Sequence, residues 1–282
     1  MAEIVYLNGA YRPSSEATVH YEDRGYQFSD GVYEVILVRR GRTVDAAPHL
    51  ARLDRSLAAL DIDAPLGAGP LNVIVAETIR RNRVVEGLVY IQVTRGVASR
   101  DHVFPGRARP SIVCVAKKRD WPAAGSKPKA ISAISVLDER WARCDIKSVG
   151  LLANVLAKEK AKQGGGGEAI LVSADGTVRE GGSSNLWIVT ADGRLRTHPL
   201  DQHILGGVTR QAIVALAEGA QIHVDETAFK MADLLGAREV FVTSATSFVK
   251  PVTKVDGKVI GDGAVGPVTL RLFDLYNAHT LA

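Results

Sequence analysis

The sequence is poor in cysteine and in long apolar runs. Its two cysteines, Cys114 and Cys144, can form at most one disulfide bridge and lack the spacing of metal sites, so we expect buried free thiols and no bound metal. No window approaches the roughly 18 apolar residues of a membrane span. The N-terminus also lacks the basic and apolar segments of a signal peptide. We therefore expect a cytoplasmic protein without membrane contact.

The sequence also lacks long runs of like charge. The chain has 35 Lys and Arg against 31 Asp and Glu, a net charge of +4, and no run of five or six like charges, so nucleic acid is not an expected partner. Apolar residues make up 46% and charged residues 23%, which is typical of a globular protein. The first lysine is Lys117, so any catalytic lysine must lie beyond it.

Hydrophobic periodicity predicts a mixed α/β protein with two domains. Asn8-Gly9 favours a hairpin turn after residues 4–7, and leucines at helical spacing over 50–60 and apolar residues over 71–79 predict two helices. Charge, proline and glycine interrupt the pattern near residue 120. We predict an N-terminal domain over 1–118, a linker over 119–128 and a C-terminal domain over 129–282. Further expected strands lie at 31–38, 88–94, 111–116, 130–136, 169–173 and 185–189, and further helices at 151–162, 209–217, 228–235 and 268–279.

Several familiar motifs do not fit. The glycine run 164–167 is followed by Glu168-Ala169 and not by the Lys-Ser or Lys-Thr of a phosphate-binding loop, so it predicts a flexible connection. Gly181-Gly182-Ser183 begins like the turn that carries a hydrolase serine but lacks the final glycine. The seven histidines show no paired metal spacing.

The remaining segments carry a resemblance to a known family. They are Glu22–Phe28, Asp30–Val35, Thr94–Gly96, Arg143–Ser148 and Glu180–Asn185. Together and in order, these segments resemble the D-amino-acid aminotransferases. That family belongs to the fold-type-IV enzymes that use pyridoxal 5'-phosphate (PLP), whose fold is α/β of the α+β type with two domains. The resemblance spans nearly the whole chain.

The resemblance implies a catalytic lysine and its counterpart carboxylate. Lys147 matches the lysine that forms a Schiff base with PLP, which requires a neutral amine, and the nearby apolar Ile146 and cationic Arg143 favour a lowered pKa. Glu180 matches the carboxylate that faces the pyridine nitrogen of the cofactor. Taken alone, either residue would be read as an ordinary solvated side chain.

Further cofactor residues follow from the same resemblance. Arg52 matches a phosphate-binding arginine, and the glycine-led segment before Val208 and Thr209 could offer helix amides and a hydroxyl to the phosphate. The other expected cofactor contacts are Ser183, Ser184, Asn185, Ser244 and Thr246. One position departs from the family pattern, because Ala245 stands where relatives usually have threonine, and we expect weaker cofactor binding.

The expected substrate contacts are Tyr33, Arg100 and His102. They match the residues with which the family holds the α-carboxylate of a D-amino acid, and the arginine loop reaches the neighbouring subunit, which implies a homodimer. The implied reaction transfers an amino group from D-alanine or D-glutamate to 2-oxoglutarate or pyruvate. A branched-chain L-aminotransferase, an aminodeoxychorismate lyase and a non-catalytic PLP-binding protein remain alternatives.

Overall fold

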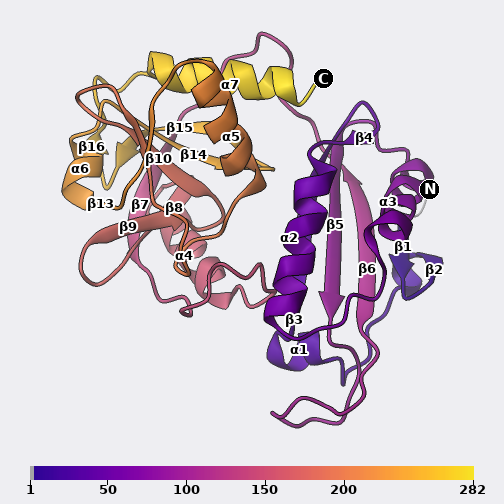
Figure 1. The fold of residues 1–282 in the computed structure, drawn as a ribbon. Helices are drawn as coiled ribbons and strands as arrows, with labels where there is room; N and C mark the ends of the chain where they lie inside the picture. Colours follow the sequence, from indigo (N-terminus) through magenta and orange to yellow (C-terminus); the bar gives the residue numbers. More distant parts are fainter. Residues whose placement is uncertain (1–2) are drawn as a thin grey trace. The chain divides into compact units, whose positions relative to one another are not determined.

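The structure, a computed structural model, describes residues 3–282 and divides the chain into two compact units. The first unit contains the chain through Trp121 together with Ile146–Gly150, and the second contains Pro122–Asp145 and Leu151–Ala282. Each unit is built on its own sheet (Figure 1). The domain limits at residues 118 and 129 stay a prediction.

The first unit holds an antiparallel sheet in the order β2-β1-β6-β5-β3-β4. Its strands are β1 (Ile4–Leu7), β2 (Ala10–Pro13), β3 (Gly31–Arg39), β4 (Arg42–Thr43), β5 (Gly87–Thr94) and β6 (Ser111–Lys118). Its helices are α1 (Arg24–Phe28), α2 (Ala46–Ala59) and α3 (Ala68–Asn82), with a 3₁₀ turn, η1 (Ser14–Glu16). The predicted hairpin is confirmed, since Asn8 and Gly9 both take the positive φ of a two-residue turn.

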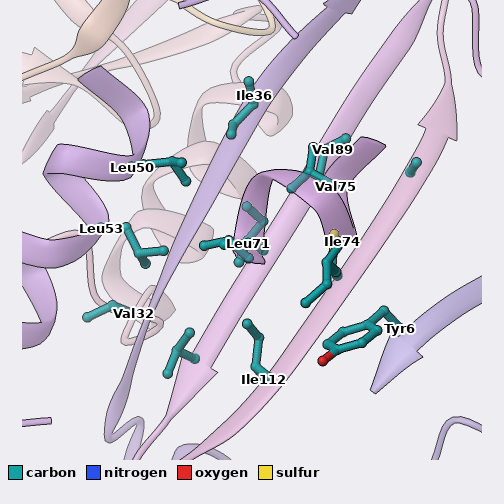
Figure 2. Close-up of a cluster of buried hydrophobic side chains, with 14 of the residues drawn as sticks. Tyr6, Val32, Ile36, Leu50, Leu53, Leu71, Ile74, Val75, Val89 and Ile112 are labelled. Atoms are coloured by element: carbon teal, nitrogen blue, oxygen red, sulfur yellow. The ribbon is translucent and has the colours of Figure 1, made fainter. Parts of the chain in front are cut away.

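The core of the first unit lies between the sheet and the helices α2 and α3. Figure 2 shows Leu50 of α2 near Ile36 of β3. Leu53 of α2 and Leu71 of α3 belong to the same cluster, and all four side chains are buried. Burying an aliphatic side chain of this size stabilises the fold by about 1.5–3 kcal/mol. The leucine spacing in the sequence therefore corresponds to the helix faces that cover the sheet.

The second unit holds a mixed sheet in the order β12-β11-β10-β14-β15-β7-β8-β9-β13, with β16 paired to β15. Its strands are β7 (Ile131–Leu137), β8 (Glu168–Val172), β9 (Thr177–Gly181), β10 (Asn185–Val189), β11 (Leu195–Thr197), β12 (Val224–Glu226), β13 (Phe229–Lys230), β14 (Glu239–Ser244), β15 (Phe248–Val255) and β16 (Lys258–Val259). Its helices are α4 (Leu152–Gln163), α5 (Val208–Gly219), α6 (Met231–Leu235) and α7 (Pro267–His279).

The strand order of the second unit brings the ends of several strands together. The β7 and β8 strands are parallel and joined through α4, whereas β10 pairs antiparallel with β14 so that Asn185 stands opposite Thr243. The first residue of β10 and the last residues of β14 therefore lie side by side. This edge carries several of the residues that the sequence singles out.

Two local predictions differ from the structure. The helix expected over 228–235 begins only at Met231, because Phe229 and Lys230 pair with β9 as a short strand. The glycine run 164–167 is not the flexible connection that we expected. Gly166 donates to Ala161 O at 2.7 Å and Gly167 to Ser132 O at 2.8 Å, so the backbone of the turn is fixed by hydrogen bonds.

Both cysteines are buried free thiols, as expected, and burial raises the pKa of each to about 11. Across residues 3–282, the helices are too short or too polar to pass through a membrane.

The glycine turn generates a stability prediction. A Cβ at Gly166 would lie 2.9 Å from Ile134 Cγ1 and 3.2 Å from Ala161 O, so Gly166→Ala should destabilise the fold by about 1–3 kcal/mol. Gly219, at the end of α5, has open space around the same position, and Gly219→Ala should stabilise the fold by about 0.5–1 kcal/mol. Differential scanning calorimetry should show melting temperatures that move in opposite directions. A melting temperature unchanged by Gly166→Ala would contradict the close packing of this turn.

Candidate functional site

Lys147 lies beside the first residues of strand β3. Its carbonyl accepts a hydrogen bond from Tyr33 N at 3.0 Å, and Val149 N donates to Gly31 O at 3.0 Å, so the segment pairs with the start of β3. Lys147 N donates to Ser56 Oγ of α2 at 3.3 Å. The lysine backbone is therefore fixed on both sides, by a strand and by a helix.

The side chain of Lys147 lies over an aromatic ring. Its Nζ is 4.1 Å from the ring centroid of Tyr33, which itself stacks on Tyr90 with centroids 5.7 Å apart. Lys147 is half-buried, and its charge also acts on the carboxylate of Glu34. The structure thus brings together Lys147 and Tyr33, which the sequence assigned to cofactor and substrate.

Glu34 is a buried carboxylate that the sequence analysis did not assign. It accepts two hydrogen bonds from Arg52, at 2.7 and 2.8 Å, and lies 2.7 Å from Nδ1 of His49. Burial alone would raise the pKa of Glu34, but the bonds to Arg52 and His49 outweigh it and lower the pKa to about 2. Glu34 therefore stays ionised and fixes the plane of the Arg52 guanidinium.

Arg143, the cation expected to act on Lys147, pairs with a neighbouring carboxylate. Arg143 is exposed and forms two hydrogen bonds to Asp145, both of 2.9 Å, so a carboxylate balances its charge. The cationic neighbour expected from sequence proximity is therefore already paired.

In the second unit, Glu180 lies on β9 and is almost fully buried. One carboxylate oxygen accepts a hydrogen bond from Arg140 Nη1 at 2.5 Å, and the other accepts one from Asn185 Nδ2 at 3.0 Å. The backbone N–H of Leu205 lies 3.2 and 3.3 Å from the two oxygens. Both oxygens of the carboxylate are thus matched by donors from the protein.

Arg140 links Glu180 to a second carboxylate. Its guanidinium donates to both oxygens of Asp138 at 2.9 Å and to His203 O at 3.0 Å. Burial raises the pKa of Glu180 to about 7, and the guanidinium of Arg140 opposes this rise. The pKa of Glu180 therefore results from two opposing effects, burial and a cation.

Asn185 connects Glu180 to a helix N-terminus. Besides Glu180, its amide donates to Leu205 O at 2.8 Å, and a Cβ at Gly207 would overlap its side-chain oxygen. Gly207 is the N-cap of α5 and provides no side-chain cap, so the amides around Val208 and Thr209 can bind an anion.

The end of β14 supplies hydroxyl groups beside Asn185. Ser244 Oγ lies 3.3 Å from the hydroxyl of Thr246 and accepts a hydrogen bond from Ser247 N at 3.1 Å. Ala245, the departure from the family pattern, lies between these two hydroxyls in the chain. Glu180, Asn185, the start of α5 and the end of β14 thus form one group.

Ser184 contacts a different carboxylate, Glu168, and Ser183 contacts the lysine that pairs with it. Ser184 Oγ donates to Glu168 at 2.9 Å, and Lys158 Nζ lies 3.0 Å from Glu168 and 3.3 Å from Ser183 Oγ. Ser183 is exposed and Ser184 is buried. This network holds the turn that follows Glu180.

Arg100 and His102 meet at another aromatic ring in the first unit. The guanidinium carbon of Arg100 is 5.0 Å from the Phe28 ring centroid, and the rings of Phe28 and His102 are 5.4 Å apart. Both basic side chains are exposed, on the chain between β5 and β6.

Sequence reasoning missed Glu34, His49, Arg140 and Asp138. Glu34 lies inside a segment that the resemblance uses, and its position directly after Tyr33 is the one available signal. Arg140 has no such signal, since its partner Glu180 is forty positions away in the sequence. Across residues 3–282, no three His, Cys, Asp or Glu side chains gather in a way that could hold a metal ion.

The groups have distinct chemical capacities. Lys147 offers an amine, which can act as a nucleophile or move a proton when it is neutral. Glu180 offers a buried carboxylate for a cationic ring nitrogen. The start of α5 and the nearby hydroxyls offer donors for a phosphate. Arg100 and His102 offer an exposed guanidinium and an imidazole ring that can bind a carboxylate.

Arg140 generates a prediction about Glu180. Arg140→Met removes the cation that lowers the pKa of Glu180 and leaves the negative Asp138 nearby, so the pKa should rise from about 7 by at least about one pH unit. Carbon-13 NMR of the glutamate carboxyl groups in the cofactor-free protein measures the midpoint, with Glu180→Gln to assign the signal. Arg143→Met, which removes an exposed arginine, is the control. A midpoint that stays near 7 would contradict the assigned effect.

Comparison with known proteins identifies the family. Residues 31–255 match the family Amino-transferase class IV. The D-alanine aminotransferase of Staphylococcus haemolyticus is 42% identical over 276 residues, which cover 98% of this chain and 97% of that protein. The D-alanine aminotransferase of Bacillus licheniformis is 42% identical over 265 residues, which cover 94% of this chain and 93% of that protein.

Solved structures agree on the fold. The branched-chain amino acid aminotransferase of Escherichia coli has a TM-score of 0.88 at 25% identity, over 96% of this chain and 92% of that one. The branched-chain aminotransferase of the archaeon Thermoproteus uzoniensis, solved with norvaline, has a TM-score of 0.86 at 27% identity, over 100% of this chain and 95% of that one. The predicted fold class is therefore confirmed, and the chain belongs to the class IV aminotransferases.

Proposed function

We propose that this class IV aminotransferase moves the amino group of a D-amino acid, of the D-alanine or D-glutamate type, to a 2-oxo acid such as 2-oxoglutarate or pyruvate. The observation that carries the proposal is the 42% identity to D-alanine aminotransferases along nearly the whole of both chains. The geometry is compatible with it, because the expected amine, carboxylate and anion-binding groups are all present.

The cofactor is pyridoxal 5'-phosphate, as in the class IV aminotransferases, and the residues fit it. Gly207 leaves the start of α5 open beside Asn185, where a Cβ would overlap the asparagine side chain. We assign the phosphate to the amides at Val208 and Thr209, to the hydroxyls of Ser244 and Thr246, and to Arg52. When bound, the cofactor supplies an electron sink for negative charge at the substrate Cα.

The remaining cofactor contacts are a lysine, a carboxylate and a turn. Lys147 would hold the cofactor covalently, and Glu180 would face its pyridine nitrogen. Ser183, Ser184 and Asn185 would hold the ring from the turn after Glu180. The donors around Glu180 support this role, since a fixed and partly balanced carboxylate can keep a ring nitrogen protonated.

The chain's own groups would bind the substrate and move its proton. Arg100, His102 and Tyr33 would bind the α-carboxylate, and Lys147 Nζ would accept and return the proton at the substrate Cα. The aromatic face of Tyr33, 4.1 Å from Nζ, limits where the amine can move. Tyr33 would therefore serve both the lysine and the substrate.

Branched-chain L-amino acids are the second candidate substrates. The structural neighbours named above are branched-chain aminotransferases, and they share the fold at 25% and 27% identity. The higher identity to D-alanine aminotransferases favours the D-series. Assembly as a homodimer belongs to the same proposal and rests on the family resemblance, and a cytoplasmic location also stays a proposal.

Lys147 should carry the cofactor. Borohydride reduction of the PLP-loaded protein, followed by peptide mass spectrometry, should find the pyridoxyl group on Lys147. Lys147→Ala should keep its circular dichroism spectrum and lose both the label and the transaminase activity. Lys158, which is already paired with Glu168, is the control, and Lys158→Ala should retain the label. A pyridoxyl group on Lys158 or Lys250 in the wild-type protein would overturn the assignment.

Arg100→Ala should weaken the use of D-alanine. A charge-assisted hydrogen bond contributes about 1.5–3 kcal/mol, so kcat/KM should fall roughly ten- to a hundredfold while the absorption of bound cofactor is unchanged. Arg107→Ala, on the same stretch of chain, is the control.

The substrate series is tested separately. Stopped-flow half-reactions of the wild type with D-alanine, D-glutamate, L-valine and L-leucine compare the two series. Faster reaction with the L-amino acids would instead support the branched-chain alternative.

A further inference from the structure

The chain between β5 and β6, residues 95–110, is long and has no helix or strand. Within these residues, all of which the structure describes, the one regular feature is an isolated bridge between Val97 and Asp23. Loops of this length without secondary structure are uncommon in compact domains and usually serve a function. Arg100 and His102 lie on this loop, so its conformation sets where their basic groups are presented.

Arg24 connects the loop to the rest of the first unit. Its side chain is 3% exposed, although arginine is rarely buried without a partner. Nη1 donates to Asp101 O at 2.6 Å and lies 3.5 Å from Val103 O. These two carbonyls come directly before and after His102 in the chain, so one guanidinium group restrains the backbone on both sides of that residue.

The carboxylate of Asp30, whose side chain is 9% exposed, holds Arg24 in place. Its Nε donates to Asp30 Oδ2 at 2.8 Å, and the same oxygen accepts a hydrogen bond from Arg95 Nε at 2.7 Å. Arg95 also donates to Leu60 O at the end of α2 and lies 3.7 Å from the ring centroid of Phe104. Asp30 thus binds both Arg24 of α1 and Arg95 of the loop, and Arg95 also ties the loop to the end of α2.

Phe28 completes the arrangement. Arg24 lies 4.8 Å and Arg100 lies 5.0 Å from its ring centroid, and His102 packs on it. Phe28 ends α1, and Arg24 begins the same helix. The short helix α1 therefore presents one buried anchor and one aromatic surface to the segment that carries the two basic residues.

We propose that Arg24 is a positioning residue that sets the enzyme's affinity for carboxylate-bearing substrates. It holds the backbone of residues 101–103 so that Arg100 and His102 are presented in one arrangement. This inference rests on the proposed function, in which those two residues bind the substrate α-carboxylate. In this role Arg24 would act through the loop backbone and not by touching the substrate.

The physical reason is preorganisation. A loop that samples many arrangements must be ordered when substrate binds, and the entropy lost lowers affinity. The carboxylate is not changed by the reaction, so its binding contributes equally to the ground state and the transition state. Loosening the loop should therefore raise KM and leave kcat nearly unchanged.

The test uses Arg24→Met and Arg24→Lys in the full-length, PLP-loaded enzyme. We expect KM for D-alanine to rise about tenfold or more in Arg24→Met, with kcat within about twofold of wild type. Hydrogen exchange measured by mass spectrometry should be faster, by about fivefold or more, at residues 98–104. The absorption spectrum of the bound cofactor should not change. Arg24→Lys keeps the cation but not the planar fork, so it should also raise KM.

Arg39→Met is the matched control. Arg39 is 6% exposed and pairs with Glu86 at the opposite end of β5, so its loss removes a buried arginine from the same unit without removing an anchor of the loop. A role of Arg24 in general stability would lower the melting temperature and affect kcat and KM as Arg39→Met does. Should Arg24→Met fail to fold, Arg24→Lys carries the same test.

Two outcomes separate this inference from the function on which it depends. If Arg100→Ala raises KM and neither Arg24 variant does, or if exchange at residues 98–104 is unchanged, Arg24 is not a positioning residue. If Arg100→Ala also leaves KM unchanged, the carboxylate site itself is wrong and the inference falls with it.

Discussion

A carboxylate removed from water must be matched by donors, and each group of candidate site residues is organised around one. Glu34 orients Arg52 and His49, Glu180 collects Arg140 and Asn185, and Asp30 joins two arginines. Removing one partner of such a pair costs about 3–5 kcal/mol, because the remaining charge is left buried and unpaired. These interactions therefore fix side-chain positions more firmly than exposed ion pairs can.

The placement of these carboxylates explains how a mixed fold presents reactive groups. Glu34 and Glu180 are both strand residues, so the sheets set the positions of their backbones. Their arginine and histidine partners come from α2 or a connecting segment, whereas Asn185 begins β10. Lys147 itself lies on an extended segment that pairs with β3, beside Glu34 and Tyr33. The two carboxylates thus lie on strands of the sheets, and the lysine lies on an extended segment outside the named strands.

Much of the fold could be predicted from local patterns. Leu50 and Leu53 recur at helical spacing because they face the sheet, and Asn8-Gly9 turns the first hairpin because both residues tolerate positive φ. The glycine run could not be read correctly, because its hydrogen bonds to Ala161 and Ser132 depend on how α4 and β7 pack. A flexible loop and a tightly packed glycine turn have the same local composition.

The candidate site also contains residues that local sequence patterns can and cannot predict. Lys147 and Glu180 could be proposed because they lie in segments that resemble a family. Arg140 contacts Glu180 only because β9 lies beside the segment after β7, which brings residues forty positions apart to 2.5 Å.

Because the fold is so similar to that of branched-chain aminotransferases, the arrangement of helices and strands does not by itself determine the substrate. A TM-score of 0.88 at 25% identity means that the sheets and helices superpose although most side chains differ. Under the proposed function, the choice between D- and L-amino acids depends on how the carboxylate of the substrate is held relative to Lys147 and the cofactor. In this chain the groups suited to holding it lie on an irregular loop, and the shape of that loop is set by a buried network of Arg24, Asp30 and Arg95. Substitutions in such a network can change specificity while leaving every substrate-contacting residue in place.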